Sequence, residues 1–377
     1  MTSAIYPENR HNPYYIVAPP YVRTSAGIRA LHLLGHALNK KGCNAFMASI
    51  RLNPDFLTKP LTLDVIDHHH ENKITPIVIY PETVKGNPYG APFVVRYIMN
   101  FPGLLGGDKH YPKSEMCFGY SKELLEGQRA EDQSNVLYIP GCDTATFHPP
   151  SENTPRKGSC YFASKFKNVH NGKTFPITND SFEITRDLPD SLSPQEIAEL
   201  LRKSEVFYAY ENTALATEAT LCGCPAVFLP NPHLTKRIAT EESGTNGIAW
   251  GSDPKEVERA KATVHLAYED YLKQIDLFWT QLDQFIELTQ NAVKKEDYPE
   301  RIVKARLKQD PYLGSFSEFE KPKLKTTRQK FYGALSVMVG LAEEDGVVGL
   351  IRKVIKALRQ GGIPTVINRA RGIYFRK

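Results

Sequence analysis

Cysteine is scarce in this sequence, and its few copies are scattered. The 377 residues include six cysteines, of which only Cys222 and Cys224 are close together, and no Cys-x-x-Cys pair occurs. This spacing argues against a zinc site and against a disulfide framework. We therefore expect a protein of a reducing cytoplasm, in which each cysteine is a small buried apolar residue.

Long apolar runs are missing as well. Residues 1–15 are polar and contain no apolar core of a secretory signal, and no uncharged apolar run approaches the length of a membrane span. The composition, with 41% hydrophobic and 24% charged residues, is that of a soluble globular protein. Because 377 residues exceed one typical hydrophobic core, two domains are expected.

Acidic residues are absent after Asp345, and this C-terminal stretch carries a concentrated positive charge. Its eight basic residues are Arg352, Lys353, Lys356, Arg359, Arg369, Arg371, Arg376 and Lys377. Without them the chain has 39 basic and 42 acidic residues, a net charge of −3 in place of +5. Residues 347–358 and 363–374 each form an amphipathic pattern, and basic amphipathic helices bind anionic membrane surfaces. Packing of their apolar faces on the N-terminal domain is the alternative.

The chain begins with a pattern of strand, helix and strand. Residues 14–18 are apolar and of strand length, residues 24–27 open a helix with apolar periodicity that ends near Gly42, and residues 45–50 predict the next strand. This order implies a parallel α/β sheet. Gly27 lies at the first junction between strand and helix, where a glycine lets the backbone approach a ligand.

A buried strand at residues 77–80 runs into a defined loop at residues 81–91 that contains two prolines and two glycines. Residues 94–100 follow as a predicted helix. The functional interpretation places Glu82, Asn87 and Arg96 around a bound ligand, because polar groups beyond the carboxyl end of a strand line such sites. In the alternative, the loop is a structural turn and Glu82 caps the next helix.

The segment from residue 206 to residue 230 predicts a strand, a polar turn, a short helix, a tight glycine turn and a second strand. The turn contains Glu211, Asn212 and Thr213, and the helix begins at Ala214. Backbone N–H groups and the positive dipole end of the helix favour a phosphate there. Glu218 lies one helical turn further on, where it can reach a sugar hydroxyl of the same ligand.

Two further groups of ionisable residues stand out. Lys165 and Lys167 follow a predicted strand at residues 160–163, and they are candidates for neutralising a diphosphate. A solvated basic loop is the alternative. The histidine triplet at residues 68–70 predicts a solvated loop rather than a metal site, because adjacent residues rarely converge on one ion.

Two of these segments resemble motifs of GT-B glycosyltransferases, especially family-4-like enzymes. Glu218-Ala-Thr-Leu-Cys-Gly-Cys-Pro-Ala-Val227 resembles the donor-binding motif Glu-Ala-x-x-Cys-Gly-x-Pro-Val. Residues 136–150 resemble the interdomain pattern Pro-x-Gly-x-Asp-x-x-x-Phe-x-Pro, with Pro140 and Gly141 adjacent rather than spaced. The resemblance covers roughly residues 14–290. It implies an α/β protein of the GT-B fold, in which two Rossmann-like domains face a cleft.

The predicted organisation has three parts. Residues 1–150 form a Rossmann-like acceptor-binding domain, residues 151–292 form a Rossmann-like domain for the nucleotide sugar, and residues 293–377 form a tether and a basic amphipathic helical extension. In the family the donor is a nucleotide-diphosphate sugar, and neither a cofactor nor a metal is required. The absence of an Asp-x-Asp motif agrees with this expectation.

The resemblance assigns roles to single residues. Gly27, Lys165, Lys167, Asn212, Thr213, Ala214 and Glu218 are expected on the donor, with Glu218 on its ribose, and Asn87 and Arg96 on the acceptor side. Retaining relatives carry a further Glu eight positions before the donor Glu, where this chain has Tyr210, and Glu211 comes one residue late. The catalytic candidates are therefore Glu211 and, as the general base of an inverting enzyme, Glu82. His32 and His36 also lie in the first domain, where an inverting enzyme needs its general base.

These features together predict a glycosyltransferase of the hexosyl or deoxyhexosyl type. The basic C-terminal segment suggests a lipid-linked glycan acceptor, a position on the inner face of the cell membrane, and a role in bacterial surface polysaccharide synthesis, such as O-antigen or capsule. Nucleic acid is not an expected partner, because the basic charge is terminal and lacks an aromatic platform. A nucleotide-sugar epimerase and a non-catalytic sugar-binding or scaffold subunit are the alternatives.

Overall fold

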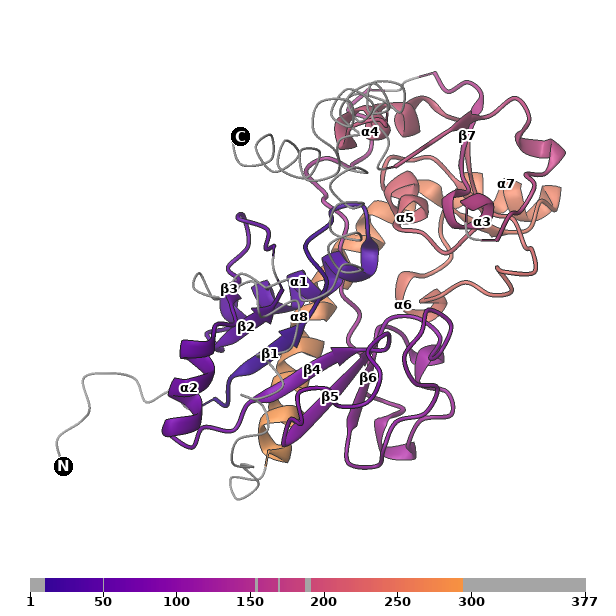
Figure 1. Ribbon diagram of the computed structural model, residues 1–377. Coiled ribbons are helices and arrows are strands. Elements are labelled where there is room, and N and C mark those ends of the chain that lie inside the picture. Colours follow the sequence, from indigo (N-terminus) through magenta and orange to yellow (C-terminus); the bar gives the residue numbers. More distant parts are fainter. Residues whose placement is uncertain (1–10, 50, 153–154, 169, 187–190, 294–377) are drawn as a thin grey trace, which may run out of the picture. The chain divides into compact units, whose positions relative to one another are not determined.

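The computed structural model describes residues 11–293, apart from residues 50, 153–154, 169 and 187–190 (Figure 1). The predicted C-terminal amphipathic extension lies outside the described residues. Both sheets of the described part belong to one compact unit of the chain.

The first sheet has six strands, all parallel, in the order β3-β2-β1-β4-β5-β6. Its strands are β1 Tyr14–Val17, β2 Ala45–Ala48, β3 Lys59–Pro60, β4 Ile77–Pro81, β5 Phe93–Ile98 and β6 Met116–Gly119. The central strands β1 and β4 are buried along their whole length, because a parallel sheet is covered on both faces. The helices α1 Ala26–Lys40 and α2 Leu63–Glu71 follow β1 and β3, and the short helices η1 Lys122–Leu125 and η2 Ala130–Asp132 follow β6.

The predicted helix at residues 94–100 is wrong, because these residues form strand β5. Phe93–Ile98 pairs in parallel with both β4 and β6, and five of its six residues are buried. The segment Phe-Val-Val-Arg-Tyr-Ile is rich in β-branched and aromatic residues, which favour a buried strand over a helix. Glu82 therefore caps no helix at this place.

The second sheet has five strands, again all parallel, in the order β11-β10-β9-β7-β8. Its strands are β7 Ser159–Phe162, β8 Phe182–Glu183, β9 Val206–Ala209, β10 Ala226–Phe228 and β11 Ile248–Trp250. The helices between them are α3 Ser164–Asn168, η3 Pro176–Thr178, α4 Pro194–Lys203, α5 Ala214–Leu221 and α6 Thr240–Ser243. The helix α4 begins with a capping box between Ser193 and Glu196.

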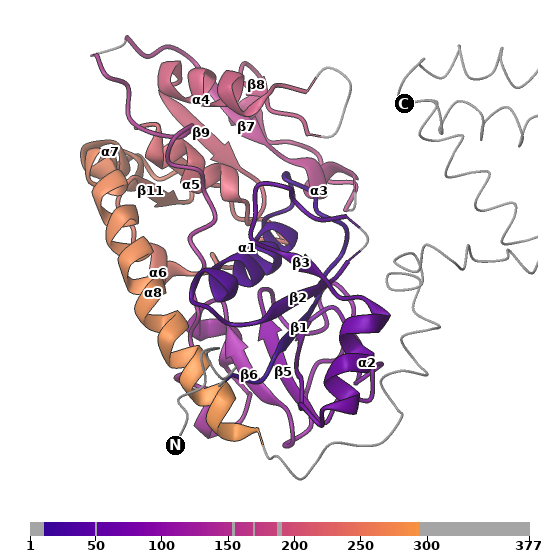
Figure 2. The same ribbon diagram turned by 90° about the vertical axis from the view of Figure 1, so that its left-hand side faces the viewer.

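Two helices follow the last strand, α7 Pro254–Thr263 and the 26-residue α8 Ala267–Ala292, with the 3-10 turn η4 Val264–Leu266 between them. Figure 2 shows α8 as the long orange helix beside the first sheet. Tyr271, near its start, packs in the apolar core of the second sheet, whereas Phe278, Leu282 and Phe285 pack in the core of the first. The two cores are thus connected by one helix.

The described part therefore contains two Rossmann-like α/β sheets, as the resemblance to GT-B enzymes implied. In each sheet the strand order reverses direction beside the first strand, between β1 and β4 and between β7 and β9. Ligands of open α/β sheets bind outside the carboxyl ends of the strands at such a switch point. The predicted boundaries at residues 150 and 292 stay a prediction.

Candidate functional site

The switch point of the second sheet brings together two of the predicted donor segments. Strand β7 pairs with β9 from Ser159 and Val206 to Phe162 and Ala209, so both strands end at the same edge. Residues 163–165 follow β7 there, and residues 210–213 follow β9. Chain segments that are 46 positions apart in sequence thus meet at the edge where a ligand is expected.

Glu211 lies at this edge and caps the helix α3. Its Oε2 accepts hydrogen bonds from the backbone N–H groups of Lys165 (2.6 Å) and Phe166 (3.1 Å). The residue is 9% exposed. The carboxylate therefore holds the turn after β7 against the turn after β9, and its catalytic role stays a prediction.

The two predicted lysines differ in their surroundings. The Lys167 Nζ lies 2.8 Å from both carboxylate oxygens of Glu183, and the Tyr161 hydroxyl donates to the same carboxylate. The positive charge of Lys167 is thus already compensated. Lys165 is exposed and has no ion pair within the described ranges. The structure therefore leaves Lys165 as the freer of the two cations for a diphosphate.

The turn before α5 is held by its own side chains. Asn212 donates to the carbonyl of Lys236 at 3.1 Å and accepts from the N–H of Ile238 at 3.1 Å. Thr213 is the N-cap residue of α5, and its hydroxyl accepts from the N–H of Leu215. Ala214 is the first helical residue, as predicted. The geometry of a strand, a fixed turn and a helix N-terminus is thus present as the motif required.

Glu218 is buried beside an arginine that the sequence analysis did not single out. The residue is 1% exposed, and its Oε1 lies 3.5 Å from Nη2 of Arg29. Arg29 belongs to α1, 189 positions earlier, so no sequence spacing indicated this contact. Gly27 lies in the first turn of the same helix, and a Cβ added there would be 3.8 Å from the Met99 Cε. Helix α1 of the first sheet and helix α5 of the second thus contact each other.

Glu82 lies at the carboxyl end of β4 and is almost fully buried. The residue is 3% exposed, and its Oε2 accepts from the N–H of Met99 at 3.1 Å. Burial raises the pKa of this carboxyl, although the hydrogen bond from Met99 opposes the shift. A raised pKa is what a carboxyl needs in order to take a proton near neutral pH.

The other two acceptor-side candidates stabilise the loop at residues 81–91. Asn87 bonds the backbone of Ala91 through both its oxygen and its nitrogen, and it accepts from the Tyr80 hydroxyl. Arg96 is fully buried and donates to Glu115 and to loop carbonyl groups. The structure thus gives both side chains partners within the protein, and their contact with an acceptor stays a prediction.

The histidine triplet forms the last turns of helix α2, so the predicted solvated loop is wrong. The Thr62 hydroxyl accepts from the Val65 N–H and caps the start of this helix. His69 is 7% exposed, and a 2.7 Å hydrogen bond joins its Nδ1 to the Tyr15 hydroxyl. His32 is buried too, and its Nε2 contacts the carbonyl of Pro19 at 3.0 Å, whereas His36 Nδ1 accepts from Leu57 N–H.

We expect His69 to make folding stability depend on pH between about 6.5 and 4. Burial, with a smaller contribution from neighbouring His68, lowers the pKa of His69 from 6.5 to about 4. Between these values protons bind preferentially to the unfolded chain, so stability falls as the pH is lowered through this range. Urea unfolding of the wild type and of His69→Gln at pH 7 and pH 5 measures the effect. The wild type should exceed His69→Gln in free energy of unfolding by less at pH 5 than at pH 7. An equal difference at both pH values would contradict the lowered pKa of His69.

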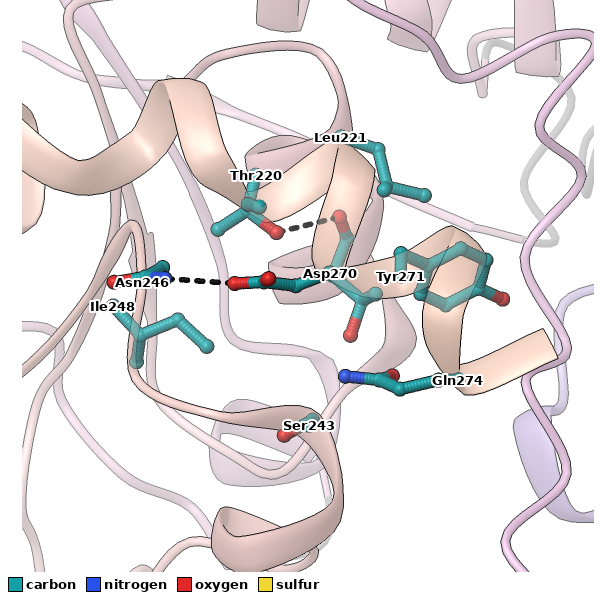
Figure 3. A pocket seen from close by; sticks show the side chains of 10 residues that line it. Thr220, Leu221, Ser243, Asn246, Ile248, Asp270, Tyr271 and Gln274 are labelled. Carbon is teal, nitrogen blue, oxygen red and sulfur yellow. Dashed lines mark hydrogen bonds between the residues drawn. The ribbon is translucent and has the colours of Figure 1, made fainter. Parts of the chain in front are cut away.

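A small pocket lies on another side of α5 (Figure 3). Thr220 from α5 and Asp270, Tyr271 and Gln274 from α8 line it, and Asn246 donates to the Asp270 carboxylate at 2.7 Å. None of the predicted donor or acceptor residues lines this pocket.

The described residues contain neither a metal-binding cluster nor a helix that could span a membrane. No group of three or more His, Cys, Asp or Glu residues in this part of the chain is arranged to hold a metal ion. Among the helices that the structure describes, none has the length and apolar character needed to cross a membrane.

No protein-family model matches the sequence, and no curated protein matches it. Among solved structures, the glycosyltransferase SnogD from Streptomyces nogalater shares 13% identity and a TM-score of 0.39 over 74% of this chain and 99% of that chain. A glycosyltransferase from Rickettsia africae ESF-5 shares 11% identity and a TM-score of 0.44, with 74% and 98% covered. T4 phage BGT, in complex with its UDP-glucose substrate, shares 10% identity and a TM-score of 0.42, with 74% and 99% covered. Likeness at these scores defines no activity for this chain.

Proposed function

We propose that this protein is a glycosyltransferase that uses a nucleotide-sugar donor. The observation that supports this most is the unit β9–α5. There the segment that carries the motif forms a strand, a turn and a helix capped by Thr213. The turn lies at the carboxyl end of a strand of a parallel sheet, where ligands are expected. Glu218 lies one turn inside that helix. Backbone N–H groups at the helix start suit the donor diphosphate, and the carboxylate suits a ribose hydroxyl.

In this proposal the departing nucleotide diphosphate is stabilised by the N-terminus of α5 and by Lys165. Fixed dipoles and cations aimed at a developing negative charge lower the barrier without a metal ion, so the reaction needs neither metal nor cofactor. Glu218 is 1% exposed, so the donor reaches it only if its surroundings, including Arg29, shift on binding. Donor binding and a local rearrangement at this contact are therefore coupled.

On the acceptor side we propose Glu82 as the general base. Its position at the carboxyl end of β4 and its raised pKa support this role. The acceptor would be a lipid-linked glycan of a bacterial surface polysaccharide, reached at the inner face of the cell membrane. That part of the proposal depends on the basic residues after 345, which lie outside the described part of the chain.

The first experiment measures binding and hydrolysis of UDP-, GDP-, dTDP- and CMP-linked sugars, in buffer with and without EDTA. We expect saturable binding of one donor that EDTA does not change. Glu218→Gln should weaken it about tenfold to a hundredfold, because a charge-assisted hydrogen bond is replaced by a neutral one at a buried position. Glu199→Gln, which changes an exposed carboxylate on α4, is the matched control and should bind as the wild type does.

Hydrolysis separates the catalytic candidates from the binding residues. Glu82→Gln should leave donor binding unchanged and should lower the turnover of donor, since it removes only the base. If the wild type binds no donor while its circular dichroism shows a folded protein, the glycosyltransferase proposal fails.

A non-catalytic sugar-binding subunit is the second candidate. Two observations favour it. The Glu211 Oε2 accepts hydrogen bonds from two backbone N–H groups, and Tyr210 is buried at the position where retaining GT-B enzymes carry a Glu. Saturable binding of a donor without any hydrolysis or transfer would favour this candidate over an enzyme.

A further inference from the structure

Arg29 is a buried arginine whose hydrogen bonds are few and long. It is 9% exposed, and it donates through Nη1 to the carbonyl of Arg23 at 3.3 Å and through Nη2 to Glu218 at 3.5 Å. Within the described ranges, its Nε has no hydrogen-bond acceptor. A guanidinium is always charged and carries five N–H donors, so a buried one is normally well satisfied.

The same chain shows what a fully satisfied arginine looks like. Arg96 is 0% exposed and makes four hydrogen bonds of 2.7–3.0 Å, to Glu115 and to the carbonyl groups of Val84 and Gly86. Arg29 is buried almost as deeply but has two bonds at the long end of the range. The contrast indicates that Arg29 has donor capacity left for a partner that is not part of the chain.

The Arg29 nitrogen without an acceptor among the described residues lies against a glycine. Gly141, in the segment that resembles the interdomain motif, faces it, and a Cβ added to that glycine would lie 3.7 Å from the Arg29 Nε. Glu218, which Arg29 contacts, comes four residues after Ala214, so its backbone lies about 6 Å along the helix axis from the first residue of α5. An arginine at this distance can reach a phosphate at the helix start.

The diphosphate of the proposed donor carries more than one negative charge, and Lys165 supplies only one positive charge. The charge of Lys167 is compensated by Glu183 at 2.8 Å, which leaves Lys165 as the exposed cation at this edge. A diphosphate is better held by an arginine, whose planar fork binds two phosphate oxygens at once.

We propose that Arg29 binds the diphosphate of the donor and so supplies, from the first sheet, a cation for a ligand bound on the second. This inference rests on the proposed nucleotide-sugar function. In the absence of donor, Arg29 contacts Glu218 instead. When the donor binds, the guanidinium turns to the diphosphate and leaves the Glu218 carboxylate for the ribose.

The test compares ligands with and without the diphosphate. Dissociation constants of UDP, GDP and dTDP, and of the matching nucleosides, are measured by calorimetry for the wild type, Arg29→Gln and Arg29→Lys. Lys41→Gln is the matched control, because it removes one positive charge at the far end of the same helix. We expect Arg29→Gln to raise the dissociation constant of the nucleoside diphosphate about tenfold to a hundredfold, and that of the nucleoside less than about twofold. Arg29→Lys should raise the dissociation constant of the diphosphate by a smaller factor. Lys41→Gln should change neither dissociation constant.

Equal weakening of nucleoside and nucleoside diphosphate by Arg29→Gln would overturn the inference, because Arg29 would then act only by positioning Glu218. A second comparison makes the same distinction: Arg29→Gln should still weaken the diphosphate when Glu218 is already Gln. If Arg29→Gln does not fold, Arg29→Lys serves in its place, and unchanged diphosphate binding in Arg29→Lys overturns the bidentate contact.

Failure of the inference can be told from failure of the proposed function. If the wild type binds a nucleoside diphosphate and Arg29→Gln binds it equally well, the role of Arg29 is wrong and the function stands. If the wild type binds none of the three diphosphates, both fail together.

Discussion

Replacing Arg96 with methionine is expected to lower the free energy of unfolding by about 3–5 kcal/mol, because it breaks a buried ion pair from one side. The guanidinium donates to Glu115 Oε2 through Nε at 3.0 Å and Nη2 at 2.7 Å, and both side chains are at most 5% exposed. Without Arg96 the Glu115 carboxylate is buried without its cation. The carbonyl groups of Val84 and Gly86 lose their donors as well.

Urea unfolding followed by circular dichroism measures the change, provided that the m-value stays constant. Lys122→Met is the matched control: it breaks a 3.5 Å ion pair with Glu241 in which the side chains are 64% and 70% exposed. That variant should lose less than about 1 kcal/mol. A loss of under about 1 kcal/mol in Arg96→Met would show that the pair and its loop contacts do not stabilise the first sheet.

Replacing Tyr210 with glutamate is expected to destabilise the protein by about 4 kcal/mol or more. Tyr210 is 1% exposed and packs against Phe166 and Phe175, with ring centroids 5.0 Å and 5.2 Å away. Its hydroxyl accepts from the N–H of Phe175 at 2.6 Å and contacts the Thr178 hydroxyl at 2.7 Å. Tyr210→Glu would remove a large aromatic ring and bury a carboxylate among apolar groups.

Tyr210→Phe is the control, since it keeps the ring and removes only the hydroxyl. It leaves the Phe175 N–H without its acceptor and should cost about 1–3 kcal/mol. Urea midpoints for both variants measure the difference. If Tyr210→Glu is as stable as the wild type, the site admits a carboxylate after all, and a catalytic Glu at this position becomes compatible with the fold.

The sequence was sufficient for the elements whose signals are local. The segment around Glu218 has strand, cap, helix and glycine turn in order along the sequence, so these elements were predicted where they occur. Strand β5 was missed because a short apolar run with one charge at Arg96 has no period long enough to separate a strand from a helix. What decides the case is pairing with β4 and β6 on both sides, which is a property of the sheet.

The partners of the site residues could not be predicted for a similar reason. Glu211 binds backbone N–H groups 45 and 46 positions away, and Glu218 contacts Arg29 across 189 positions. A motif specifies which residue types occur and at what local spacing. It does not specify which distant side chain lies beside them, so the contacts within the candidate site could not be predicted.

The helix α8 has a consequence for how the chain is made. The Tyr14 hydroxyl in the first strand bonds the Thr289 hydroxyl at 2.8 Å, and the two residues are 275 positions apart. At typical rates of translation, that separation corresponds to a delay on the order of tens of seconds. The first sheet thus leaves the ribosome with all its strands but without the helix that covers part of its core. Nascent chains that stop before α8 would expose this apolar surface, and we expect them to be the forms that chaperones and proteases recognise.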